Sequence, residues 1–110
     1  MEKPQDRIEY LRGLLAEDPN EPFLHYAICL EIMKKDGDAA LPFFRELLLA
    51  HPSYLPAYFQ TARLMAENGL TNEAVEVLDL GLPVAESQSD FHALSEMKGL
   101  KQDILAGEFD

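Results

Sequence analysis

His25 and Cys29 are the residues whose types and spacing come closest to a catalytic or metal site in this sequence. Side chains four residues apart on a helix share one face, where an imidazole can deprotonate a thiol or both groups can ligate a metal. A buried free cysteine, however, usually behaves as an inert small apolar side chain. Both positions also belong to the set that we expect to pack between helices, so we predict no enzyme activity. A small enzyme or metal protein that uses this pair with a nearby carboxylate stays an alternative.

The other motifs do not indicate a catalytic, metal or cofactor site. His51 and His92 complete no HxxH or HExxH pattern, and the sequence has no CxxC pair. The acidic turn at residues 36–38 lacks the further ligands and the closing glutamate of a calcium loop. The glycines are isolated, so they form no phosphate-binding loop, and there is no GxSxG elbow. We predict that the protein needs no cofactor and no metal.

Charge and cysteine content narrow the class of partner and the compartment. Twenty acidic residues stand against nine basic ones, which gives a net charge of −11, and the basic residues are scattered along the chain. We therefore expect neither nucleic acid nor an anionic membrane as a partner. Cys29 is the single cysteine, which excludes an internal disulfide, and residues 1–6 contain no apolar segment of a secretory signal. These features favour a cytoplasmic protein, and 110 residues fit one domain.

A recurring motif gives the strongest indication of the fold. The Leu-rich stretch that ends at Pro52 resembles an earlier one that ends at Pro19, and equivalent apolar positions recur in alternate helices at a nearly constant step. A period of about 34 residues is typical of stacked helical hairpins, which offer a curved surface rather than an enclosed catalytic pocket. The three columns are Leu11, Phe44 and Leu78; Ile8, Leu41 and Val75; and Leu15, Leu48 and Leu82.

Apolar residues at helical spacing, bounded by Pro, Gly, Asn and Asp, predict six helices. Asn20 and Thr71 are the expected amino-terminal caps of the second and fifth helices. Residues 36–38 are expected to form a tight turn, with Pro42 in the first turn of the helix that follows. Pro83 is expected to kink the end of the fifth helix. We place the helices at residues 4–17, 21–35, 39–51, 55–67, from 71 onward, and at 91–106.

The repeat resembles the tetratricopeptide repeat, whose unit of about 34 residues forms two antiparallel helices. The match is clearest in the second unit, where Tyr58 takes an aromatic position and Ala62 and Ala74 take small-residue positions. Asn68 and Gly69 form the turn between the two helices of that unit. The equivalent positions of the first unit hold His25, Cys29 and Ala40, with Pro52 as the closing proline.

The resemblance implies an all-α fold, a right-handed α-solenoid of antiparallel helix hairpins with about two and a half repeat units and a capping helix. We assign residues 4–17 to an amino-terminal half-unit, 21–51 to the first full unit, 55–86 to the second and 90–106 to the cap. Four positions depart from the family pattern, and one of them is Pro83, which is an unexpected proline in the second unit. His25 replaces an aromatic residue, Gly81 replaces alanine, and Glu86 replaces the closing proline.

The resemblance also implies a binding surface on the concave face, which the first helix of each hairpin lines. Aromatic and Met side chains beside an arginine are typical of protein-binding hot spots. The family positions that bind a carboxyl-terminal acid through Lys and Asn hold other residues in this chain, so we expect an apolar extended peptide or an amphipathic helix. The candidate residues are Tyr26, Leu30, Met33 and Lys34 in the first unit, and Phe59, Arg63 and Ala66 in the second.

These features predict a non-catalytic protein–protein interaction module, an adaptor or assembly factor that binds a peptide or helix in the concave groove. Two alternatives remain for the apolar residues of this surface. A homodimer would bury them between two copies of the chain, which would make the protein structural. Alternatively, Tyr26 and Leu30 only cover the core or the capping helix.

Overall fold

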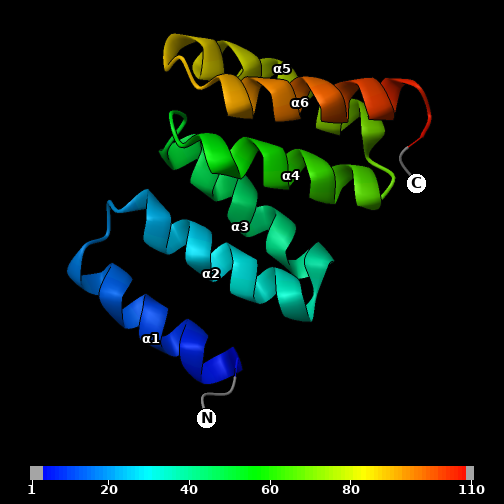
Figure 1. The fold of residues 1–110 in the computed structure, drawn as a ribbon. Coiled ribbons are helices and arrows are strands. Elements are labelled where there is room, and N and C mark those ends of the chain that lie inside the picture. Colours follow the sequence, from blue (N-terminus) through cyan, green and yellow to red (C-terminus); the bar gives the residue numbers. More distant parts are fainter. Residues whose placement is uncertain (1–3, 109–110) are drawn as a thin grey trace. The chain divides into compact units, whose positions relative to one another are not determined.

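Six α-helices and no strand make up the part of the chain that the structure describes (Figure 1). The structure is a computed structural model of residues 4–108, with side chains described from Arg7 onward, so residues 1–3 of the segment considered for a signal lie outside it. The all-α solenoid class predicted from the sequence is confirmed. The helices are α1 (Pro4–Glu17), α2 (Pro22–Lys35), α3 (Gly37–Ala50), α4 (Leu55–Glu67), α5 (Thr71–Ser87) and α6 (Phe91–Leu105).

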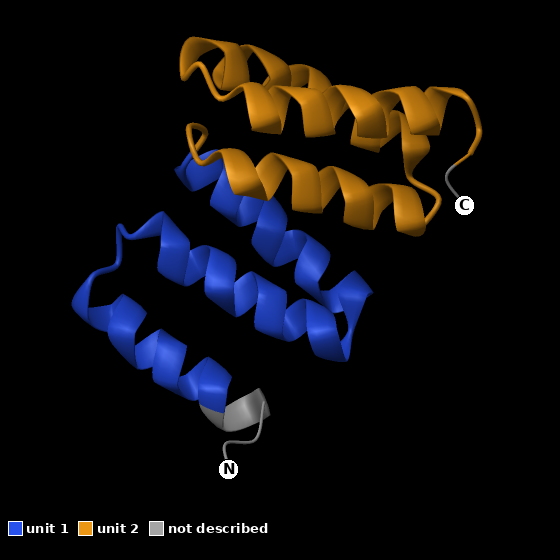
Figure 2. Cartoon of the chain, viewed as in Figure 1, with its two compact units in different colours: residues 1–51 blue, residues 52–110 orange. Residues whose placement is uncertain are grey.

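The helices form two compact units, residues 1–51 and residues 52–110 (Figure 2). In unit 1, α2 packs against both α1 and α3. In unit 2, α5 packs against α4 and α6, and α4 also contacts α6. The division falls at Pro52, which is the proline expected to close the first full repeat.

The boundaries in unit 1 differ from the prediction at two caps. Glu21, and not Asn20, caps α2, because its carboxylate accepts the N–H of Phe23 at 3.2 Å and Pro22 then takes the first helical position. Asp36 ends α2 and also caps α3, accepting the N–H of Ala39 at 3.3 Å. The expected turn over residues 36–38 is therefore reduced to one residue.

This early start of α3 changes the position of Pro42. The helix begins at Gly37, two residues before the predicted start, so Pro42 lies in its second turn and not in its first. A proline at that position has no N–H to donate to the carbonyl of Asp38. The prediction that Pro42 marks the first turn is wrong, although α3 continues through it to Ala50.

Unit 2 follows the prediction more closely. Helix α4 has the predicted bounds and ends in a Schellman turn, in which Gly69 has a φ of 79° and Leu70 donates its N–H to the carbonyl of Met65 at 2.8 Å. Leu70 is then the residue before α5, so Thr71 is the first helical residue and not the predicted cap. Helix α5 continues through Pro83 to Ser87.

The turn into α6 is also stabilised by a cap. The side chain of Asp90 accepts the N–H of Ala93 at 3.0 Å, as expected of a residue that precedes a helix. Ser89, just before it, has a φ of 54°, a left-handed conformation that is uncommon for a residue other than glycine. The helix ends at Leu105, one residue before the predicted end.

The core confirms the central repeat column and the small-residue positions. Phe44 and Leu78 are fully buried, and so are Ala62 and Ala74. Small residues at these positions let neighbouring helices approach closely. This close packing sets the geometry of the hairpins that carry the surface residues. Within residues 4–108, no helix is both long and apolar enough to cross a membrane.

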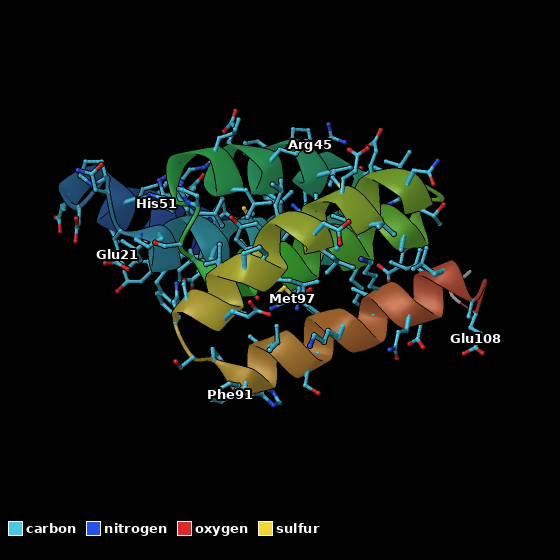
Figure 3. The ribbon with its side chains drawn as sticks, turned by 90° about the horizontal axis from the view of Figure 1, so that it is seen from above. Glu21, Arg45, His51, Phe91, Met97 and Glu108 are labelled. Atoms are coloured by element: carbon cyan, nitrogen blue, oxygen red, sulfur yellow. The ribbon has the colours of Figure 1, made fainter. Side chains whose placement is uncertain are left out.

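Gly81 lies at a tight contact between helices. A Cβ added there would lie 2.8 Å from Cγ of Tyr58 and 2.9 Å from Sδ of Met97, so α4 and α6 both meet α5 at this residue. Figure 3 shows Met97 between α5 and α6, whereas Phe91 lies on the outer side of α6. The absence of a side chain at position 81, where alanine is usual, therefore has a packing reason.

Candidate binding groove

The seven residues predicted for the concave face are divided between the two units. Four of them lie on α2 of unit 1 and three on α4 of unit 2. Each unit is therefore considered by itself. In unit 2, Phe59 and Arg63 line an open hollow, whereas Ala66 does not.

The hollow lies between α4 and α6 and has a volume of about 370 Å³. Phe59 and Arg63 are one turn apart on α4, so their side chains line the same wall. The other wall is a stripe along two turns of α6. We call this hollow the α4–α6 groove, and its α6 residues are Ser95, Glu96, Gly99, Leu100 and Asp103.

The groove has apolar residues among those that line it. Phe59 is half-buried and Leu100 is 7% exposed, so Phe59 offers more apolar surface to a partner than Leu100 does. Gly99 is in the middle of the α6 wall, and nothing lies within 4 Å of the point where a Cβ would stand. A partner backbone can therefore approach α6 closely at this residue.

Three charged side chains, Arg63, Glu96 and Asp103, line the same groove. Nε of Arg63 lies 3.6 Å from Oε2 of Glu67, a carboxylate on the next turn of the same helix. Nε2 of His92 lies 3.3 Å from Oε1 of Glu96. Asp103 is seven residues after Glu96, which corresponds to about 10.5 Å along a helix. The α6 wall thus presents two carboxylates, one toward each end of the stripe.

Ala66 is a correction to the predicted site. It is only 2% exposed, so its methyl group belongs to the packed interior and cannot line an open surface. The resemblance to the repeat family had implied a place for Ala66 on the concave face. One side of a helix can contain both exposed and buried positions, and Ala66 is one of the buried residues that pack in the interior.

The α6 half of the groove was not found from the sequence. Helix α6 does not continue the apolar columns of the repeat, and it was therefore interpreted only as a cap. A usable signal was present, since the small residues at 95 and 99 lie one turn apart and the acidic residues at 96 and 103 lie two turns apart on one helix. Contact with α4 brings that stripe next to Phe59.

In unit 1, Lys34 belongs to an ion-pair network rather than projecting alone. Its Nζ lies 2.8 Å from Oε2 of Glu31, and Nε of Arg7 lies 3.5 Å from the same oxygen. The hydrogen bond from Lys34, and to a smaller extent the charges of Lys34 and Arg7, hold the pKa of the buried Glu31 carboxyl below its usual range. Glu31 thereby ties α1 to α2, a role that sequence reasoning missed although Glu31 and Lys34 have helical spacing.

The other predicted residues of α2 are partly covered. Tyr26 packs edge-on against Phe44, with ring centroids 6.4 Å apart. Leu30 and Met33 are half-buried. These three side chains therefore contribute to packing in unit 1 as well as to its surface.

His25 and Cys29 line a cleft in unit 1 that is smaller than the α4–α6 groove. Its volume is about 180 Å³, and Arg12, Phe43 and Glu46 also line it. Cys29 is only 2% exposed. Burial, with a smaller contribution from the charge of Glu46, raises the pKa of its thiol to about 12. The thiol is therefore protonated at neutral pH, whereas a nucleophile or metal ligand needs the thiolate.

The contacts of His25 do not show it activating the thiol of Cys29. Its Nε2 lies 3.3 Å from the carbonyl oxygen of Pro19, and its ring centroid lies 5.8 Å from that of His51. Among the described residues, no group of three or more His, Cys, Asp and Glu side chains is placed to hold a metal ion. The two residues share a cleft, but the state of the thiol argues against the catalytic alternative.

The chain consists of antiparallel helix hairpins that repeat with a period of about 34 residues and that carry a groove on their surface. This arrangement is that of a helical-repeat protein. The sequence profile of the tetratricopeptide repeat family matches residues 31–97, and the chain belongs to this family. Proteins of this fold generally bind other proteins and are typically non-catalytic.

Two solved structures of tetratricopeptide repeat domain proteins from Salinibacter ruber are similar to this chain. A crystal structure has 28% sequence identity and a TM-score of 0.72, and the match covers 76% of this chain and 96% of that one. A solution NMR structure has 30% identity and a TM-score of 0.73, with coverages of 78% and 88%. A comparison with curated proteins finds no match.

Proposed function

We propose that this protein is a non-catalytic interaction module that binds a segment of another protein in the α4–α6 groove. The observation that carries this proposal is the groove itself, an open hollow of about 370 Å³ that is lined by the apolar residues Phe59 and Leu100 together with charged residues. Apolar surface surrounded by polar groups is the usual arrangement of a protein-binding site. The family gives the same expectation, because its members generally bind other proteins.

A protein partner is favoured over the other classes of partner by charge. The net charge of −11 opposes binding to nucleic acid and anionic membranes, and it also opposes association of two copies of the chain. An adaptor or assembly role in the cytoplasm is part of this proposal. Self-association would appear as a mass that rises with protein concentration in light scattering.

Gly99→Gln provides the test of the groove. The new side chain would occupy the middle of the hollow, yet nothing lies within 4 Å of its Cβ, and glutamine is a better helix former than glycine. Leu80→Gln on α5 is the matched control, since Leu80 is exposed and lies outside the groove. Both variants should give far-UV circular dichroism spectra like that of the wild type.

The measurement is a selection of peptides from a random-sequence display library on immobilised wild-type protein, followed by binding of each selected peptide to the two variants. Peptides that bind the wild type and Leu80→Gln but lose at least about tenfold in affinity for Gly99→Gln would support the groove, since tenfold corresponds to about 1.4 kcal/mol. Selected peptides that bind all three proteins equally would refute it.

A further inference from the structure

We infer that the segment bound in the α4–α6 groove is a cationic amphipathic helix, with basic residues seven positions apart and apolar residues between them. This inference rests on the proposed function and specifies the chemistry of its partner. Three features of unit 2 carry it: the charge of the groove, the spacing of that charge, and the kind of backbone that its walls can accommodate.

Unit 2 is the more acidic part of the chain. Residues 52–110 contain ten acidic side chains and three basic ones, a net charge of −7 of the total of −11. Two of the three basic residues are already paired within the unit. Nζ of Lys101 lies 2.7 Å from Oδ1 of Asp79, and Arg63 is paired with Glu67. The field around the groove therefore attracts a cationic ligand.

The groove concentrates that charge at two points. Glu96 and Asp103 line the same wall, about 10.5 Å apart along α6, with Gly99 between them. Lys or Arg residues seven positions apart on a ligand helix have the same separation. Apolar residues three and four positions after the first basic residue would then point toward Phe59 and Leu100.

The walls of the groove favour a helical ligand over an extended one. Both walls are helices, whose backbone N–H and C=O groups are bonded within the helix and cannot pair with an extended peptide. A helical ligand satisfies its own backbone hydrogen bonds. The open position at Gly99 lets such a helix approach α6 closely.

The probe is a labelled synthetic peptide of about four helical turns, built on alanine, with Lys at positions i and i+7 and Leu at i+3 and i+4. Three comparison peptides change one property each: Glu in place of Lys, Ser in place of Leu, and a central Pro that prevents helix formation. Binding is measured by fluorescence anisotropy to the full chain. We expect the parent peptide to bind and each of the three others to bind at least about fivefold more weakly.

Variants of the protein locate the charge effect. Glu96→Gln with Asp103→Asn should weaken binding of the parent peptide about fivefold to tenfold, as expected for two partly exposed ion pairs. Glu76→Gln with Glu86→Gln changes the net charge equally outside the groove and should weaken it less than about twofold. Arg63→Gln removes the cation of the groove wall and should strengthen binding about twofold.

The results separate this inference from the proposed function on which it rests. If the Glu peptide or the Pro peptide binds as tightly as the parent, or if the two double variants have equal effects, the inference is wrong. Library peptides that depend on the groove but are not basic would then leave the proposed function standing. If neither library peptides nor the probe respond to Gly99→Gln, the groove is not the site and both proposals fail.

Discussion

Replacing Gly81 by alanine should destabilise the protein, although alanine favours a helix by about 1 kcal/mol over glycine. Gly81 lies inside α5, and a Cβ there would lie 2.8 Å from Cγ and 2.9 Å from Cβ of Tyr58. These are the atoms closest to the backbone of α4, and the far end of the Tyr58 side chain donates a hydrogen bond to the carbonyl of Pro52 at 2.6 Å. The ring therefore cannot move aside without loss of another contact.

The expected magnitude follows from two opposing terms. Overpacking of a close contact costs about 1–3 kcal/mol, and the helix propensity of alanine offsets about 1 kcal/mol of it. The net loss is therefore up to about 2 kcal/mol, which corresponds to a fall of up to about 8 °C in Tm for a chain of this size. Gly99→Ala is the control in the same unit, since it gains the propensity without a close contact and should raise Tm by about 4 °C.

Both variants can be measured by thermal and urea unfolding followed by circular dichroism. The sign of the difference between them decides the outcome, because the two substitutions are chemically identical. If Gly81→Ala is as stable as Gly99→Ala, or more stable, then α4, α5 and α6 are not packed as closely at this residue as the structure shows. The packing reason for glycine at position 81 would then be wrong.

Four further predictions concern the core and the buried polar groups. Phe44→Ala should lower the free energy of unfolding by about 3–5 kcal/mol in urea titrations, because it leaves a cavity at a fully buried site; a loss below about 1 kcal/mol would contradict that burial. Thr61→Val should raise it by about 1 kcal/mol, since Oγ1 of Thr61 is buried without a hydrogen-bond partner, and a loss of stability would show that the hydroxyl is satisfied. Glu31→Gln should cost about 1 kcal/mol at pH 7. Because the folded-state pKa of Glu31 is lowered, this difference from the wild type should be constant above about pH 4.5 and vanish as the pH falls below it, and a difference that persists in acid would refute the ion-pair network. Cys29 should react with iodoacetamide in the native protein far more slowly than in the urea-unfolded protein at pH 8, given its burial and a thiol pKa of about 12; equal rates would reopen the catalytic alternative.

The sequence predicted the features that depend on periodicity and on turn residues. Helix α4 has the predicted bounds because Pro56 and Gly69 set both ends, through local conformational preferences that need no tertiary contact. Phe44 and Leu78 were placed in the core by the step of the repeat alone. Such features are encoded within a few residues or by regular spacing.

The features that the sequence did not predict depend on side-chain geometry and on contacts between distant segments. Glu21 and Asp36 became caps because of where their carboxylates reach, which composition does not specify. The α6 wall of the groove exists because α6 contacts α4, a helix well separated from it in the chain, and Ala66 is buried for reasons of packing. Groove-lining residues that are brought together by tertiary contacts could therefore not be predicted from the sequence.

Titration of the cationic amphipathic peptide into isotope-labelled protein, followed by amide chemical shifts in NMR spectra, tests the central claim most directly. The account predicts saturable shifts concentrated at Phe59, Arg63 and residues 95–103, with little change at α1 and α3. Saturable shifts confined to unit 1, or no shifts at peptide concentrations that saturate binding in anisotropy, would contradict the assignment of the α4–α6 groove as the binding site.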